Sequence, residues 1–321
     1  MRLISSRHLV ARAVKVQTRR LSTETAAFNG ASTVELSHTA YIPKDGNATV
    51  KPLVILHGLF GSKRNWGSLC KALHRDLPDR PIYTLDLRNH GTSPHATPMT
   101  YSAMAADVFK FIQDKGLEDV SLLGHSMGGK AAMAYALHVS EAKLPPKFLS
   151  KLIVVDIAPS IGKLSPEFQQ YISAMQHIEA LEPGKINTRT DADKHLAAIE
   201  KDMSVRQFLL TNLKVPSHHP VTGHAHKAKF IVPLDILSKS MEDIGSFPFK
   251  YEEETGSSPV TWDGPTLAVK GGNSPYINHK NLPAFRAFFP NTRLSELQTG
   301  HWVHAEKPME FKKLVVDFLN H

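Results

Sequence analysis

The 321-residue sequence contains a single cysteine, Cys70, which excludes intrachain disulfides and a zinc site with four cysteine ligands. No apolar run approaches the roughly 18–20 residues that a membrane-spanning helix needs, so no stable membrane insertion is expected. The H-E-x-x-H pattern of many zinc enzymes is missing as well. Four histidines lie close together without paired carboxylates: His218, His219, His224 and His226. We expect no functional metal there, and no other cofactor.

Outside the first 21 residues, the chain also lacks a large excess of positive or negative charge. The whole chain carries 38 basic and 30 acidic residues, a formal net charge of +8. Six basic residues and no acidic ones lie in residues 1–21, and without them 32 basic residues remain, a net charge of +2. A nearly neutral body offers no phosphate-binding face, so nucleic acid is not an expected partner.

The N-terminal segment has the pattern of a mitochondrial presequence. Its basic residues stand mostly three to five apart among apolar ones: Arg2, Arg7, Arg12, Lys15, Arg19 and Arg20. This spacing predicts a basic amphipathic helix and a mitochondrial protein, with the matrix as the expected compartment. Arg19–Ser22 resembles a matrix-protease cleavage context, and a disordered basic tail is the alternative. We expect a flexible leader over residues 22–34 and one domain over 35–321.

Within this domain, strand-like and helix-like segments alternate. Short apolar runs bounded by Gly, Pro or charged residues occur at 53–57, 82–87, 120–124, 152–156, 266–269 and 293–297. Helical patterns lie between them, so the sequence predicts an α/β fold with an open, mostly parallel, doubly wound sheet. Residues 160 to about 248 show helical patterns, such as 168–181 and 191–213, and no convincing strand. We predict a helical cap over the active site there, with an extra helical layer as the alternative.

The sharpest signal is the segment Gly124–Gly129, which reads G-H-S-M-G-G between an apolar run and a helical pattern. A G-x-S-x-G motif in this strand–turn–helix context is a nucleophile elbow, with Ser126 as the nucleophile. The serine needs a strained backbone there to project its hydroxyl, and side chains at the two flanking glycines would collide in so tight a turn.

The hydroxyl needs a base, and the base needs an orienting acid, in the chain order Ser, acid, His. His301 follows the last strand and precedes the C-terminal helix, where the base belongs; His304 is the competitor and more consistent with a structural role. The usual acid position, the turn 270–275, contains no carboxylate. Asp156 ends the preceding strand at the edge that faces the site, and we select it over Asp263, which precedes its strand.

An oxyanion hole is expected from the segment His57–Gly61, which follows the first core strand. The backbone N–H groups of Met127 and Leu59, with Phe60 as the alternative to Leu59, would bind the developing oxyanion. We interpret His57 as a buried residue that shapes its loop. The polar groups of Asp86–Gly91 are interpreted in the same way, as ties between loops beneath the site.

In combination, the segments at 57–61, 86–91, 124–130, 155–159 and 300–302 resemble one branch of the α/β-hydrolase superfamily. That branch includes bacterial acyl esterases, mitochondrial abhydrolase-domain esterases and fungal ethanol acetyltransferases. The matches extend to 205–213 and 271–274, so that the resemblance covers roughly residues 35–320. It implies an α/β-hydrolase fold with a helical cap, a mitochondrial location, and a triad acid on the strand before the cap, which corresponds to Asp156.

The function expected first is hydrolysis of a small-molecule carboxylic ester or thioester by a serine esterase with a catalytic triad. The alternative is acyl transfer to an alcohol, because the same acyl-enzyme can react with an alcohol in place of water. Nothing in the motifs separates these two. A third hypothesis is a non-catalytic mitochondrial partner protein that kept the fold; the complete set of motifs argues against it. The sequence does not indicate which protein partners, if any, the chain has.

Overall fold

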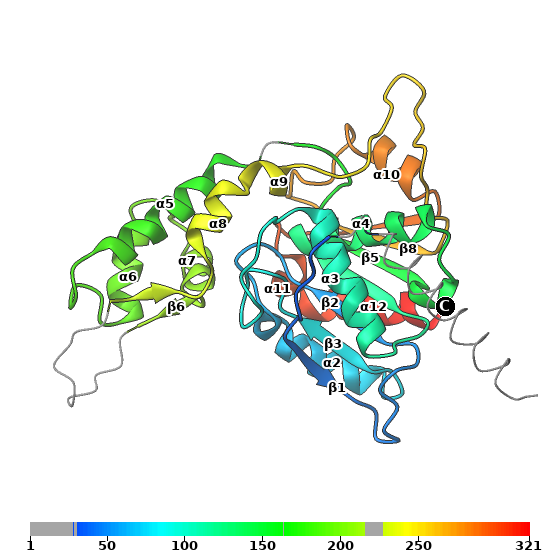
Figure 1. Cartoon of the computed structure of the whole chain (residues 1–321), viewed down its shortest axis with the longest axis horizontal. Coiled ribbons are helices and arrows are strands. Elements are labelled where there is room, and N and C mark those ends of the chain that lie inside the picture. Colours follow the sequence, from blue (N-terminus) through cyan, green and yellow to red (C-terminus); the bar gives the residue numbers. More distant parts are fainter. Residues whose placement is uncertain (1–27, 29–30, 163, 216–226) are drawn as a thin grey trace, which may run out of the picture.

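The computed structural model describes residue 28 and residues 31–162, 164–215 and 227–321 (Figure 1). Its centre is a seven-stranded sheet in the order β1-β3-β2-β4-β5-β8-β9. All neighbouring strands are parallel except β1 and β3. The strands are β1 His38–Tyr41, β2 Leu53–Leu56, β3 Ile82–Leu85, β4 Ser121–His125, β5 Lys151–Val155, β8 Thr266–Gly271 and β9 Thr292–Leu297.

The six apolar runs of the sequence correspond to β2, β3, β4, β5, β8 and β9, which confirms the mostly parallel α/β sheet. Strand β1 was not predicted. It has four residues, none fully buried, and pairs antiparallel with β3 at the edge of the sheet. An exposed edge strand this short lacks the continuous apolar run that marks a buried parallel strand.

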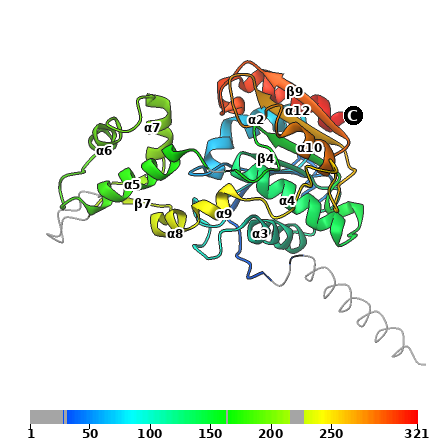
Figure 2. The same cartoon turned by 90° about the horizontal axis from the view of Figure 1, so that it is seen from above.

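Helices cover both faces of the sheet, as a doubly wound fold requires. One face packs Leu53 and Ile55 of β2 against α2 and α12, and the other packs Val54 and Leu56 against residues of α3 and α4. Figure 2 shows α2 and α12 on one side of β4, and α3 and α4 on the other. The helices of this part are η1 Lys63–Trp66, α2 Gly67–Asp76, α3 Tyr101–Asp114, α4 Met127–Glu141, η2 Pro146–Phe148, α10 Leu282–Phe288, α11 Val303–Glu306 and α12 Pro308–Asn320.

Between β5 and β8 the chain forms a helical insertion, which lies to one side of the sheet in Figure 1. Its elements are α5 Pro166–Ala180, α6 Arg189–Leu196, α7 Met203–Leu210, β6 Leu213–Lys214, β7 Lys229–Phe230, α8 Leu234–Lys239 and α9 Met241–Gly245. The predicted helical stretch 191–213 is two helices, because Asp202 caps the start of α7 by accepting a bond from Ser204 N. The expectation of no strand is wrong for β6 and β7, whose two residues each are too short to show an alternating pattern.

The segment Asp86–Gly91 ties loops together beneath the sheet edge. Asp86 accepts hydrogen bonds from the backbone N–H groups of Lys63, at 2.7 Å, and Thr92, at 2.8 Å. Arg88 donates two bonds to Asp107, at 2.6 and 2.8 Å, and both side chains are fully buried. This agrees with the structural interpretation of the segment.

Some predictions fall on residues that the structure does not describe. The predicted presequence, residues 1–21, and the histidines at 218, 219, 224 and 226 lie outside the described residues. Of the predicted leader, the structure describes Phe28, buried with its ring 4.7 Å from that of Phe109, and residues 31–34. Among the described residues, no helix is both long and apolar enough to span a bilayer.

Candidate active site

Ser126 lies at the sharp turn between β4 and α4, and its backbone is strained as the elbow motif predicts. Its φ of 54° and ψ of −119° fall in a region that non-glycine residues rarely adopt, at a cost of roughly 1–3 kcal/mol. The turn is held from the next strand, because Ser126 N donates to Val155 O at 3.0 Å. The hydroxyl therefore projects from the carboxyl end of the sheet.

The two glycines of the motif allow close backbone contacts at this turn. A Cβ at Gly124 would stand 2.1 Å from the carbonyl oxygen of Gly128, so the collision across the turn that the sequence predicts does occur. At Gly128 a Cβ would instead meet the carbonyl oxygens of Leu56 and His57, at 2.7 and 2.5 Å. The second glycine is thus required by packing against β2 rather than by the turn itself.

The structure brings Ser126, His301 and Asp156 into one hydrogen-bonded row. His301 Nε2 lies 3.0 Å from Ser126 Oγ, and His301 Nδ1 lies 2.8 Å from Asp156 Oδ2. With the proton on Nδ1, Nε2 is free to accept the serine proton, which is the arrangement of a nucleophile, a general base and an orienting acid. The three residues come from the ends of β4 and β5 and from the loop before α11.

Asp156 is fully buried directly after β5 and adopts a φ of 50°. Its N–H donates to Val269 O at 2.8 Å, which fixes the strained residue to β8. Besides His301, two groups donate to its carboxylate: Gly271 N, at the end of β8, at 2.9 Å, and the Ser274 hydroxyl in the turn that follows. The sequence argument assigned no role to Ser274. The turn that lacks a carboxylate therefore supplies donors to the carboxylate of the neighbouring strand.

The two competing assignments occupy other places. The His304 ring stacks on Trp66, with centroids 4.2 Å apart and planes 3° apart. Burial, followed by the nearby His301, lowers the pKa of His304 to about 3, so this ring is neutral. Asp263 is exposed and precedes β8, at the end of the strand opposite Gly271.

The predicted oxyanion-hole residues lie beside the nucleophile. Met127 is the first residue of α4, so its N–H has no acceptor within the helix. Phe60 N donates to His90 Nε2 at 3.2 Å, which occupies that amide and favours Leu59 as the second donor. His57 Nε2 accepts from Leu87 N at 3.0 Å, and burial lowers the pKa of His57, in agreement with a neutral loop-shaping role.

His125, to which the sequence argument gave no role, supports the base. Its Nε2 lies 2.9 Å from the backbone oxygen of His301, and the two rings are 4.7 Å apart. Burial, followed by the nearby His304 and His301, holds the pKa of His125 well below its usual value. The histidine is part of the quoted motif, yet only the tertiary structure shows that it fixes the loop of His301.

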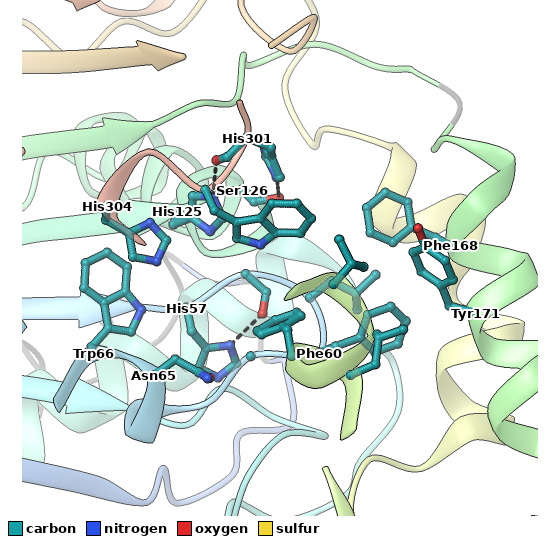
Figure 3. A pocket seen from close by; sticks show the side chains of 17 residues that line it. His57, Phe60, Asn65, Trp66, His125, Ser126, Phe168, Tyr171, His301 and His304 are labelled. Atoms are coloured by element: carbon teal, nitrogen blue, oxygen red, sulfur yellow. Dashed lines mark hydrogen bonds between the residues drawn. The ribbon is translucent and has the colours of Figure 1, made fainter. Parts of the chain in front are cut away.

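A pocket opens over Ser126 between the sheet domain and the helical insertion (Figure 3). Trp66 and His304 lie on one side of it, and Phe168 and Tyr171 of α5 lie on the side of the insertion. Among the described residues, no group of three or more His, Cys, Asp or Glu side chains could hold a metal ion. The arrangement supplies the groups for acyl transfer: a nucleophile, a base with its acid, and backbone N–H donors beside them.

Comparison with known proteins supports the same chemistry. A family profile described as alpha/beta hydrolase fold matches residues 51–308. The chain is 39% identical to a Xenopus laevis protein named sn-1-specific diacylglycerol lipase ABHD11, over 89% of this chain and 84% of the relative. It is 36% identical to a Saccharomyces cerevisiae protein named probable alcohol acetyltransferase, over 84% of this chain and 77% of the relative. A solved structure titled marine microorganism esterase superposes with a TM-score of 0.74 at 31% identity, covering 89% of this chain and 100% of the other.

Proposed function

The chain belongs to the alpha/beta hydrolase fold family, and from this premise we propose that it is a serine esterase that forms an acyl-enzyme on Ser126. The observation that carries the proposal is the row from Ser126 Oγ to His301 and Asp156, with contacts of 3.0 and 2.8 Å. The substrate class is a small-molecule carboxylic ester or thioester. The helical insertion acts as a cap, because Phe168 and Tyr171 of α5 line the pocket over Ser126.

In the acylation step, Ser126 Oγ attacks the carbonyl carbon of the ester while His301 Nε2 takes the hydroxyl proton. The carbonyl oxygen becomes an oxyanion and accepts hydrogen bonds from Leu59 and Met127. Loss of one such donor typically costs about 2.7–4 kcal/mol of transition-state stabilisation. When the tetrahedral intermediate collapses, the bond to the leaving oxygen breaks, and His301 Nε2 donates its proton to that oxygen.

In the deacylation step, water attacks the acyl-Ser126 ester and gives a proton to His301, which returns it to Ser126 Oγ as the acid leaves. An alcohol in place of water would give a new ester by the same steps. The second candidate function is therefore alcohol acyltransfer, which is favoured by the similarity to a protein named probable alcohol acetyltransferase.

The test is acyl release from p-nitrophenyl acetate by the full chain, with and without ethanol, beside a Ser126→Ala variant. Loss of a triad nucleophile costs on the order of 10⁶ in kcat, so even weak activity should collapse in the variant. A serine-directed phosphonate should add one adduct to the wild-type chain and none to the variant. Dioctanoylglycerol is tested as a second substrate, because one relative is named a diacylglycerol lipase.

The products separate the two functions. Acetate alone identifies a hydrolase, and ethyl acetate formed in proportion to added ethanol identifies a transferase. A wild-type chain that neither takes the phosphonate nor releases p-nitrophenol faster than the variant would contradict both functions.

We also propose that the protein resides in the mitochondrial matrix, since residues 1–21 carry six basic and no acidic residues. A fluorescent protein fused behind residues 1–35 should enter mitochondria and be shortened by cleavage. The same fusion with the six basic residues replaced by glutamine is the control and should stay outside. Equal import of the two fusions would contradict the proposal.

A further inference from the structure

Two separate cavities meet at Ser126. The first is the pocket over Ser126 described above, which we name the base cavity. It has a volume of about 50 Å³, and His301, Trp302 and Trp66 are among the residues that line it. We name the second the neck cavity; it encloses about 280 Å³ and lies where the chain enters and leaves the helical insertion, at Gly162 and Ile244. Leu59 and Phe168 line both cavities and lie at their junction. An ester carbonyl bound at Ser126 therefore has one cavity for each of its two substituents.

The position of the base decides which substituent enters which cavity. His301 must donate a proton to the leaving oxygen, so that oxygen has to lie where the imidazole is accessible. His301 lines the base cavity. On the side of the neck cavity the Tyr276 ring packs on His301, with centroids 4.2 Å apart, and Tyr276 itself lines that cavity. The leaving alcohol is thus directed into the base cavity and the acyl group into the neck cavity.

Two of the polar side chains that line the neck cavity, Lys130 and Tyr101, are bonded within the protein. Lys130 Nζ donates to the carbonyl oxygens of Gly245 and Ser246, at 3.0 and 2.9 Å, and burial lowers the pKa of Lys130 to about 8. Tyr101 OH donates to Ile244 O at 2.6 Å. These bonds hold the end of the insertion and leave Lys130 a poor partner for a substrate anion.

The asparagines that line the neck cavity are likewise engaged. Asn281 Nδ2 donates to Tyr276 O at 2.9 Å, and Asn278 Nδ2 donates to Pro275 O at 2.8 Å. No Asp or Glu is among the described residues that line this cavity. The rest of the wall is mostly apolar and includes Ile157, Ala158 and Leu164, with the uncharged hydroxyl groups of Ser160 and Tyr276 beside them. An uncharged alkyl chain fits such a wall, whereas a charged group would lose its hydration without gaining a partner.

We infer that the neck cavity binds the acyl chain and the base cavity binds the leaving alcohol. Because the neck cavity is the larger of the two, the enzyme prefers esters whose extra carbons lie on the acyl side, with a short leaving alcohol. This inference rests on the proposed acyl-Ser126 chemistry and adds which part of the substrate lies on each side of Ser126.

Two isomeric esters test the inference without any change to the protein. Ethyl butyrate and butyl acetate have the same composition and similar hydrophobicity, but they place the longer chain on opposite sides of the carbonyl. In a hydrophobic pocket one methylene is worth about 10-fold or more in kcat/KM. We expect kcat/KM of the full chain to be at least about 10-fold higher for ethyl butyrate. Equal values, or a preference for butyl acetate, would overturn the inference.

Two matched substitutions assign the cavities directly. Ala158→Val adds bulk to the wall of the neck cavity, and Val205→Phe adds bulk to the base cavity. For each variant, kcat/KM for ethyl butyrate and for butyl acetate is divided by kcat/KM for ethyl acetate. This ratio is not affected by a general loss of active enzyme. Ala158→Val should lower the ratio for ethyl butyrate by about 10-fold and leave the ratio for butyl acetate unchanged. Val205→Phe should lower the ratio for butyl acetate and leave the ratio for ethyl butyrate unchanged. The opposite pattern would show that the two groups bind the other way round.

Failure of the inference and failure of the proposed function give different results. If the function is wrong, no ester is cleaved in a manner that depends on Ser126. If only the inference is wrong, both esters are cleaved through Ser126 with the opposite or no preference. Should either variant fail to fold, the comparison of the two isomers by the wild-type chain still decides.

Discussion

Replacing Asp156 by asparagine tests the least usual feature of the site, the position of its acid. The carboxylate has two distinct sides: Oδ1 accepts from Gly271 N at 2.9 Å, and Oδ2 faces the Ser274 hydroxyl and His301 Nδ1 at 2.8 Å. In Asp156→Asn the amide oxygen satisfies Gly271, and the amide nitrogen is left facing His301. An N–H there donates to Nδ1 and moves the histidine proton to Nε2, where the ring can no longer accept the proton of Ser126.

The expected loss follows from this wrong tautomer. The same change in another serine hydrolase lowers kcat about 10⁴-fold with the geometry intact, which is roughly 5 kcal/mol of transition-state stabilisation. The assay is the kcat for p-nitrophenyl acetate, with the melting temperature as a check on folding. Asp263→Asn is the matched control and should retain full activity, because Asp263 is exposed before β8. A folded Asp156→Asn enzyme that loses less than about 10-fold would refute the assignment.

Three further predictions concern stability and the elbow. Arg88→Met leaves the fully buried Asp107 carboxylate without its ion partner, so urea denaturation should show a loss of about 3–5 kcal/mol in the free energy of unfolding; a loss below about 1 kcal/mol would contradict this. Gly124→Ala places a Cβ 2.1 Å from a backbone oxygen and should abolish soluble, active protein, whereas Gly162→Ala has no atom within 4 Å and should leave the melting temperature unchanged. The pKa of Lys130 is lowered to about 8 in the folded chain, so the unfolded chain binds more protons above that pH. The free energy of unfolding of wild type, measured relative to that of Lys130→Met, should therefore rise with pH from about 8 to about 10.4, because the other titrating groups are common to both proteins.

Most of the buried part of the fold could be predicted from the sequence, and most of the exposed part could not. Five of the predicted strands appear as apolar runs because parallel strands are covered on both faces, and Leu53–Leu56 is fully buried. The sixth, β9, is an edge strand without a buried residue. Strand β1 and the pair β6–β7 give no such pattern, since they are short and only partly buried. Their existence depends on the strand beside them, which a local pattern does not contain.

The site shows the same division between local and tertiary information. Ser126 and His301 are found from their place after a strand, because an elbow and a post-strand loop are local features. Asp156 required one additional step, the recognition that the turn 270–275 has no carboxylate. Ser274 and Tyr276 could not be assigned, since their roles consist of contacts with Asp156 and His301, each more than twenty residues away in the sequence.

The register of the sheet explains why an acid after β5 can replace one after β8. The two strands are parallel neighbours, and Val155 pairs with Val269, so the residues that follow them leave the sheet at the same edge. Asp156 turns toward His301 with a φ of 50°, which is stable because its N–H is bonded to Val269 O. The end of β8 and the turn after it supply no carboxylate; instead, Gly271 N–H and the Ser274 hydroxyl donate hydrogen bonds to the carboxylate of Asp156. A buried carboxylate needs hydrogen-bond donors whichever strand carries it. An acid that follows β5 instead of β8 therefore requires donors at the end of β8. We therefore expect that adding Asn273→Asp to the Asp156→Asn variant will not restore its activity, because these donors would still point at position 156.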